Sequence, residues 1–165
     1  MRAESRSTAS VIAIASVIAI AVAIAMFSSV AMAQSPGAGA LPGGNVIRVH
    51  YVGMPDDVGR AGCAIWSSAT GWPRQREQAT QRVGAPIKNG SAVCEFWVLP
   101  PGTYAVATFH DKQMTGKMAL NFLGMPTESY GFSNDAPVGL GPPSFDAASF
   151  KYPGGVFDIT IHAKK

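Results

Sequence analysis

Two neighbouring residues, His110 and Asp111, have the types that most directly suggest chemistry. An imidazole titrates near neutral pH and a carboxylate can orient it, so such a pair could transfer protons. The pair ends the stretch LPPGTYAVATFHD (99–111), in which a turn precedes an unbroken run of β-branched and aromatic residues. Successive side chains of a strand point to opposite faces. We therefore expect His110 to end a strand and Asp111 to cap the turn that follows.

Polar residues further along the chain could enlarge this candidate site. The segment 112–150 has no hydrophobic periodicity, and its side-chain oxygens could assemble a cation site from distant positions. No spacing enforces that arrangement. No catalytic residue is assigned, because the sequence lacks G-x-S-x-G, H-E-x-x-H, C-x-x-C and P-loop motifs. The candidate ligand site comprises His110, Asp111, Asn121, Asn134 and Asp135.

The two cysteines of the chain, Cys63 and Cys94, both fall on predicted inward faces of strands. Glu95 marks the opposite face of its strand as the solvated one, which turns Cys94 inward. The pairing predicts a disulfide, typical of an exported protein. Two separate buried thiols are the alternative.

Two tryptophans, Trp66 and Trp97, lie on strand faces opposite the cysteines. If their strands are neighbours, they could form an aromatic platform for sugar rings. The alternative is packing beneath the long loop, because large aromatic side chains are usually mostly buried.

The hydrophobic pattern predicts short strands joined by turns rich in glycine and proline. The strands are expected at residues 45–52, 61–68, 83–88, 91–98, 103–110 and 155–162. Asn89-Gly90 predicts a hairpin between the third and fourth. Neither face of 103–110 carries a charge, so we expect this strand to be covered on both sides, with 112–150 as the cover and a brief helix near 144–148. The pattern indicates one all-β domain over 45–165, a sandwich or a barrel.

The N-terminal residues have the features of a targeting segment. Arg2 and Arg6 precede an apolar run, Val11 to Phe27, and Ala31-Met32-Ala33 forms a small-x-small pattern. We expect residues 1–33 to be a signal peptide cut after Ala33, and 34–44 to be a flexible linker. An uncleaved membrane anchor is the alternative. The formal net charge is +3, without a basic cluster, which is too small and too dispersed to argue for nucleic acid or anionic lipid as a partner.

Four segments carry a family resemblance: GRAGCAIWSSATGWP (59–73), LPPGTYAVATFHD (99–111), NFLGMPTESYGFSND (121–135) and GPPSFDAASF (141–150). They resemble an exported bacterial family catalogued as domain of unknown function 2141. The resemblance implies a periplasmic or secreted domain without an established activity. LPPGTY is also similar to the strand entry of transthyretin-like sandwiches. That likeness implies an Ig-like or prealbumin-like antiparallel β-sandwich of about six to seven strands, with one long loop after the central strand.

In the family, the segment after the His-Asp pair resembles a calcium loop, D-x-N-x-N-G-x-x-D. Here it reads DKQMTGKMA (111–119), in which Asp111 and Gly116 keep the pattern and Ala119 offers no side-chain oxygen. Calcium binding stays possible, but this loop alone has too few oxygen ligands for it.

These observations lead us to expect an exported, non-catalytic binding or interaction module of the cell envelope. Its ligand would be a glycan, a peptide or a protein, and its oligomeric state is left open. Two alternatives stay open. One is a carbohydrate-binding module that uses the tryptophans, and the other is a small hydrolase or cation-binding protein that uses the loop carboxylates.

Overall fold

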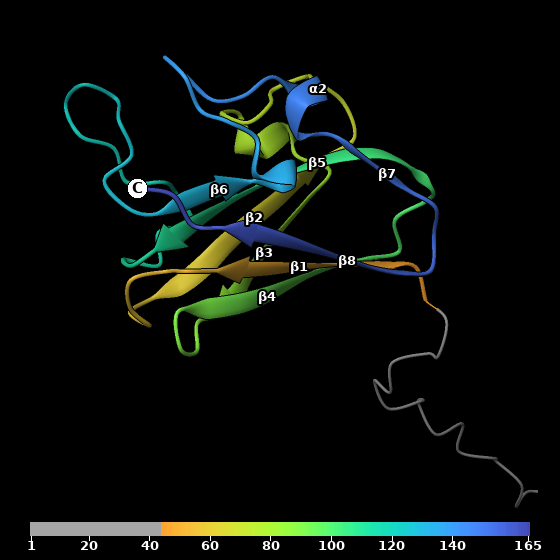
Figure 1. The fold of residues 1–165 in the computed structure, drawn as a ribbon, viewed down its shortest axis with the longest axis horizontal. Helices are drawn as coiled ribbons and strands as arrows, with labels where there is room; N and C mark the ends of the chain where they lie inside the picture. The colour runs from red at the N-terminus through yellow and green to blue at the C-terminus, as the bar shows by residue number, and fades with distance from the viewer. Residues whose placement is uncertain (1–43) are drawn as a thin grey trace, which may run out of the picture. The chain divides into compact units, whose positions relative to one another are not determined.

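The computed structural model describes residues 44–165 (Figure 1). The predicted signal peptide and most of the predicted linker lie outside the described residues. Within residues 44–165, no helix is long and apolar enough to cross a membrane.

The described chain is built from short strands, as the alternating pattern predicted. The helices are single turns, and Ser144 caps the last of them by accepting a hydrogen bond from the Ala147 N–H at 3.2 Å. This helix lies where the sequence placed it. In chain order the elements are β1 (Val46–Val52), β2 (Arg60–Trp66), η1 (Arg76–Gln78), β3 (Gln81–Pro86), β4 (Ser91–Trp97), β5 (Gly102–Asp111), β6 (Tyr130–Phe132), η2 (Ser133–Asp135), α2 (Phe145–Ala148), β7 (Phe150–Tyr152) and β8 (Val156–His162).

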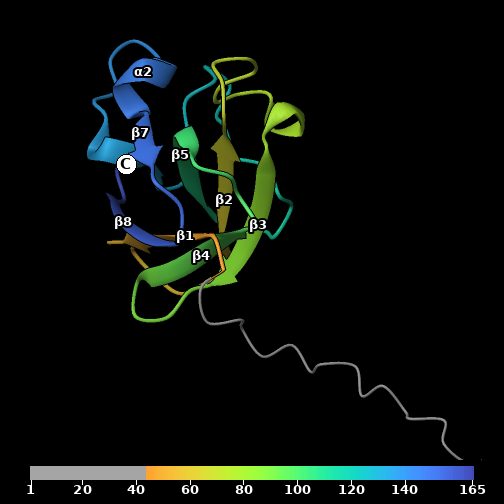
Figure 2. The same ribbon diagram turned by 90° about the vertical axis from the view of Figure 1, so that its right-hand side faces the viewer.

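The strands form two sheets, which confirms the predicted β-sandwich. One sheet has the order β4-β1-β8, and the other has the order β3-β2-β5-β6, with β7 paired to the start of β5. In Figures 1 and 2 the strands of one sheet run across those of the other. One pair of strands departs from the predicted antiparallel arrangement, since β1 and β8 are parallel. These strands lie near opposite ends of the described chain, so no tight turn constrains their direction.

The Asn89-Gly90 turn forms, but it does not join paired strands. Both residues have positive φ, and the Lys88 and Ser91 backbones exchange hydrogen bonds around them. On either side of that bridge the two strands belong to different sheets. β3 pairs with β2 in one sheet, whereas β4 pairs with β1 over its whole length in the other. The predicted pairing of these two strands is therefore wrong. The turn chemistry is local, whereas β4 finds a longer partner elsewhere.

The central strand β5 is covered on both faces, as its uncharged pattern predicted. Residues 104–111 are all buried. Tyr104 and Val106 face the core between the sheets, and Ala105 and Ala107 face a second apolar cluster on the outer side. The small alanines leave room for a cover that combines Trp72 with side chains of 132–148. The long loop is thus only part of this cover, because residues 71–79 supply the rest.

A disulfide between Cys63 and Cys94 ties the two sheets together, which confirms the pairing predicted from the sequence. Cys63 lies on β2 and Cys94 on β4, with a Cα–Cα distance of 6.4 Å, and both are buried in the core. Closing a loop between residues 31 positions apart stabilises the fold by about 3–4 kcal/mol in the chain-entropy model.

Candidate functional site

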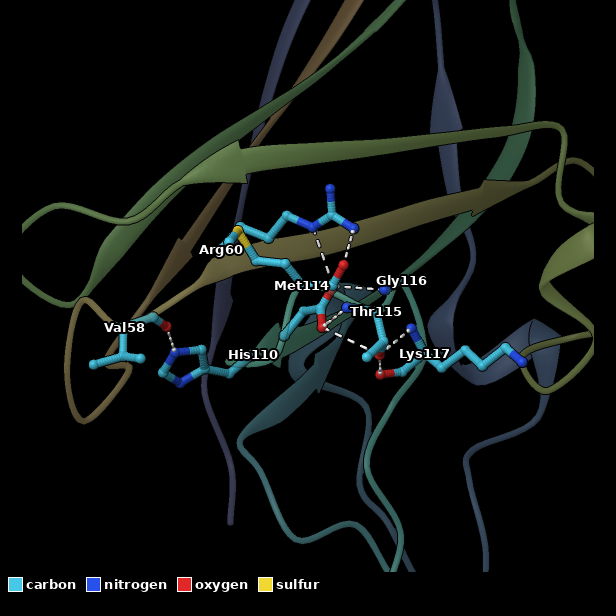
Figure 3. A network of polar contacts seen from close by, with 8 residues as sticks. Val58, Arg60, His110, Met114, Thr115, Gly116 and Lys117 are labelled. Carbon is cyan, nitrogen blue, oxygen red and sulfur yellow. Dashed lines mark hydrogen bonds and ion pairs between the residues drawn. The ribbon is translucent and has the colours of Figure 1, made fainter.

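The carboxylate of Asp111 organises the turn that follows β5 (residues 111–116). It accepts hydrogen bonds from the backbone N–H groups of Thr115 at 2.9 Å and Gly116 at 2.8 Å, and from Arg60 Nε at 3.0 Å. Figure 3 shows these donors converging from two separate chain segments. The side chain of Asp111 is only 2% exposed. Burial alone would raise its pKa, but the bonds from Gly116, Arg60 and Thr115 outweigh burial and hold the pKa below its ordinary value.

Arg60 takes the place that a cation would need in this turn. Its Nε binds Asp111 Oδ2, and its Nη2 donates to the Met114 carbonyl oxygen at 3.2 Å. A guanidinium fixed on both acceptors supplies the positive charge from within the chain. Ala119 adds no side-chain oxygen. The residues present therefore do not fit a calcium ion at this turn.

His110 is buried and turns away from Asp111, as adjacent positions on a strand should. Its Nε2 donates to the Val58 carbonyl oxygen at 2.7 Å (Figure 3). The same nitrogen lies 3.6 Å from an oxygen of Asp56. Its Nδ1 has no hydrogen-bond partner among the described residues. The contact with Val58 ties the end of β5 to the turn between β1 and β2. The expectation of a structural histidine at a strand end fits this geometry.

The remaining members of the predicted ligand site bond elsewhere. Asn121 Oδ1 accepts from backbone N–H groups within its own loop, and Asn134 Nδ2 donates to the Ser149 carbonyl oxygen at 2.7 Å. Asp135 accepts from the His162 backbone N–H at 2.9 Å and from His162 Nδ1 at 2.6 Å. Burial opposes ionisation of Asp135, yet the two bonds from His162 keep its pKa below the ordinary value.

The candidate ligand residues His110, Asp111, Asn121, Asn134 and Asp135 belong to separate hydrogen-bond networks, and the structure does not bring them together. Each polar side chain satisfies nearby backbone instead. Among residues 44–165, no three His, Cys, Asp or Glu side chains are grouped in a way that could hold a metal ion.

The structure does not bring Trp66 and Trp97 together as an aromatic platform, because their strands belong to different sheets. Trp66 is 1% exposed and lies on β2, whereas Trp97 is 38% exposed and lies on β4 of the other sheet. Trp72 packs edge-on against Trp66 with ring centroids 5.1 Å apart, and its Nε1 donates to the Pro143 carbonyl oxygen. The outer face of β2 is thus covered by the second apolar cluster. Trp66 therefore packs beneath a loop, which is the alternative that the sequence left open.

Large exposed apolar side chains gather instead on a short hairpin between β5 and β6. Figure 1 shows this loop, in cyan, extending away from the sheets. We call residues 119–127 the finger. Phe122 is 94% exposed, Leu123 71%, Met125 60% and Leu120 55%. Folded proteins rarely expose such a group without a binding role.

The finger has a regular backbone of its own. Leu120 and Pro126 form an antiparallel bridge, and the Thr127 N–H donates to the Ala119 carbonyl oxygen at 2.9 Å. At the tip, the Gly124 N–H donates to the Asn121 carbonyl oxygen at 2.9 Å, which closes a four-residue turn. Asn121 is therefore a structural residue of this turn.

Sequence reasoning missed the finger, although a local signal was present. Asn121 and Gly124 are turn residues, and between them stand Phe122 and Leu123. Large apolar residues at the centre of a tight turn must point outward. A pattern of two bulky apolar residues between turn residues could therefore have predicted an exposed apolar tip.

By its fold and its exposed loop, the protein is a disulfide-linked β-sandwich with an ordered apolar hairpin after its central strand. A family model described as "Uncharacterized protein conserved in bacteria (DUF2141)" matches residues 49–160. The chain belongs to this family, as its sequence segments indicated. No curated protein and no solved structure matches the chain. The transthyretin-like character expected from LPPGTY therefore stays a prediction.

Proposed function

We propose that this protein is a non-catalytic binding module of the cell envelope and that the finger is its contact surface. The observation that carries the proposal is the exposure of Leu120, Phe122, Leu123 and Met125 on an ordered hairpin. An apolar tip held out by its own hydrogen bonds loses little conformational entropy on binding. Its side chains gain free energy when a ligand removes them from water.

The polar centre at the end of β5 supports a binding role better than a catalytic one. Asp111 directs both oxygens at backbone and Arg60 donors, and His110 donates to a backbone carbonyl. A general base needs a free acceptor within reach of a substrate proton. Both Asp111 oxygens and His110 Nε2 bond within the chain, and His110 Nδ1, which has no partner among the described residues, belongs to a side chain that is 0% exposed and out of reach of a substrate. The carbohydrate alternative loses its main support with the burial of Trp66.

An extracytoplasmic location is part of the proposal. The Cys63–Cys94 disulfide fits a periplasmic or extracellular protein, because such bonds persist in oxidising compartments. The predicted signal peptide, which lies outside the described residues, agrees with this location.

Site-specific photo-crosslinking in intact cells tests the proposal. The crosslinking amino acid benzoyl-phenylalanine would replace Phe122 in one strain and Leu140 in a control strain. Leu140 is fully exposed on another loop, so it controls for chance contact. We expect an envelope adduct, with protein or with lipid, at position 122 and none at position 140. Equal labelling at both positions, or none at either, would contradict the proposal.

A further inference from the structure

We propose that the finger inserts its tip into the surface of a phospholipid bilayer. This inference rests on the proposed function, since it names the partner of the same contact surface. Four observations carry it: the convex tip, its length, the pairing of its backbone and the charge of its flanks.

The tip is convex, and its most exposed side chains are its largest apolar ones. Phe122 and Leu123 occupy the two central positions of the turn from Asn121 to Gly124. A convex apolar tip needs a concave apolar pocket in a protein partner, but a bilayer accepts it without a preformed pocket. From Ala119 to the tip the finger spans three residues, or about 10 Å when extended. This reach matches the roughly 5–10 Å to which interfacial segments enter a membrane.

Most backbone N–H groups of the finger are hydrogen-bonded within the finger, which favours burial away from water. The N–H groups of Asn121, Leu123, Gly124, Met125 and Thr127 all have acceptors inside the finger, at 2.8 to 3.0 Å. Pro126 has no N–H group. Unpaired backbone N–H and C=O groups raise the cost of placing a loop in a bilayer. Among residues 44–165 the Leu120 and Phe122 N–H groups have no acceptor, so the pairing of the finger lowers this cost without removing it.

The charges beside the finger suit phospholipid headgroups. Between Asp111 and Glu128 the only charged side chains are those of Lys112 and Lys117. Lys112 pairs with Asp56 at 2.6 Å and lies 3.8 Å from the carboxylate of Glu128, which follows the finger and is 26% exposed. Lys117 is exposed at the base of the finger. A single exposed cation gives a modest attraction to anionic lipid. The apolar tip must then provide most of the affinity, so binding should depend only weakly on salt.

Vesicle flotation tests this inference. The full chain would be mixed with vesicles of phosphatidylethanolamine and phosphatidylglycerol, and bound protein would be measured after flotation. The test variant is Phe122→Ser with Leu123→Ser. The matched control is Val98→Ser with Leu140→Ser, which removes two apolar side chains elsewhere that are also largely exposed, at 85% and 114%. All chains share residues 1–43, so any contribution of that segment is common to them.

We expect the control variant to bind like the natural chain and the tip variant to bind roughly tenfold more weakly or worse, given what two buried apolar side chains contribute. In a Leu123→Trp variant, vesicles should shift the added tryptophan emission to the blue, and lipids brominated on their acyl chains should quench it. Vesicle binding that is equal in all variants, or absent, would overturn the inference.

The crosslinking experiment separates this failure from failure of the proposed function. If the protein does not bind vesicles but the crosslinker at position 122 forms an adduct with an envelope protein, the lipid inference is wrong and the binding role stands. If vesicles fail and position 122 labels nothing, both are wrong. A second copy of the chain could offer a shallow apolar hollow of about 480 Å³ beside Tyr152 and Phe157. Self-association that the tip variant abolishes would place the finger there and overturn the lipid partner.

Discussion

Replacing Asp111 with asparagine should destabilise the fold by about 3 kcal/mol, although the substitution changes the shape of the side chain little. The amide oxygen can keep the bond from the Thr115 N–H, but the amide nitrogen cannot accept from Gly116 or Arg60. Each hydrogen bond to a charged group contributes about 1.5–3 kcal/mol. Because the Arg60 side chain is 39% exposed, solvent screens its bond to Asp111. The combined loss of the two bonds from Gly116 and Arg60 therefore lies near the lower end of the range for two such bonds.

Urea denaturation at neutral pH measures this loss. Asp158→Asn is the matched control, because Asp158 pairs with His50 at 2.8 Å but is 51% exposed. We expect that variant to lose less than about 1 kcal/mol. If Asp111→Asn loses no more than the control, then the carboxylate does not organise the turn and the structural assignment of Asp111 is wrong.

Acid titration of the same variants gives the sign of the charge effect. The pKa of Asp111 is lowered in the folded state, so the unfolded chain takes up the proton first as the pH falls. The stability that this carboxylate contributes is fully present above its ordinary unfolded pKa. It is lost as the pH falls through the lowered, folded pKa. The difference in free energy of unfolding between the natural chain and Asp111→Asn should therefore shrink as the pH falls from the ordinary, unfolded pKa of Asp111 through its lowered, folded pKa.

Three further predictions concern the disulfide, a buried glycine and added calcium. Replacing Cys63 and Cys94 with alanine should lower the free energy of unfolding by about 3–4 kcal/mol in urea titrations, and an unchanged value would refute a stabilising disulfide. Gly62→Ala should cost about 1–3 kcal/mol, because the added Cβ would lie 2.5 Å from the Phe109 ring, whereas the Cβ of Gly139→Ala meets nothing within 4 Å and should cost less. Excess calcium should leave the melting temperature unchanged, because a guanidinium already holds the acceptors of the turn, and a rise would show that the ion displaces it.

The sequence predicted those parts of the fold whose signal is local. The inward position of Cys94 opposite Glu95 followed from the period of two, and so did a strand at 103–110 buried on both faces. Ser144 marked the start of α2 by its capping chemistry. Asp111 was expected to cap a turn, and its bonds to Thr115 and Gly116 show that it does.

The parts that could not be predicted depend on residues far apart in the sequence. β6 and β7 have three residues each, too few for a periodic pattern, and they become strands only by pairing with β5. Arg60 reaches Asp111 across 51 positions, which no spacing rule anticipates. The burial of Trp66 depends on Trp72, whose loop folds over β2.

The most direct test of the central claim is to map which residues a partner perturbs. Backbone amide NMR signals of the isotopically labelled protein would be followed while phospholipid vesicles or envelope membranes are added. We expect the signal changes to concentrate on residues 119–127, while the Asp111 turn and the disulfide-linked core stay unperturbed. Changes centred on His110 and Asp111, or on the hollow beside Tyr152, with the finger unaffected, would contradict it.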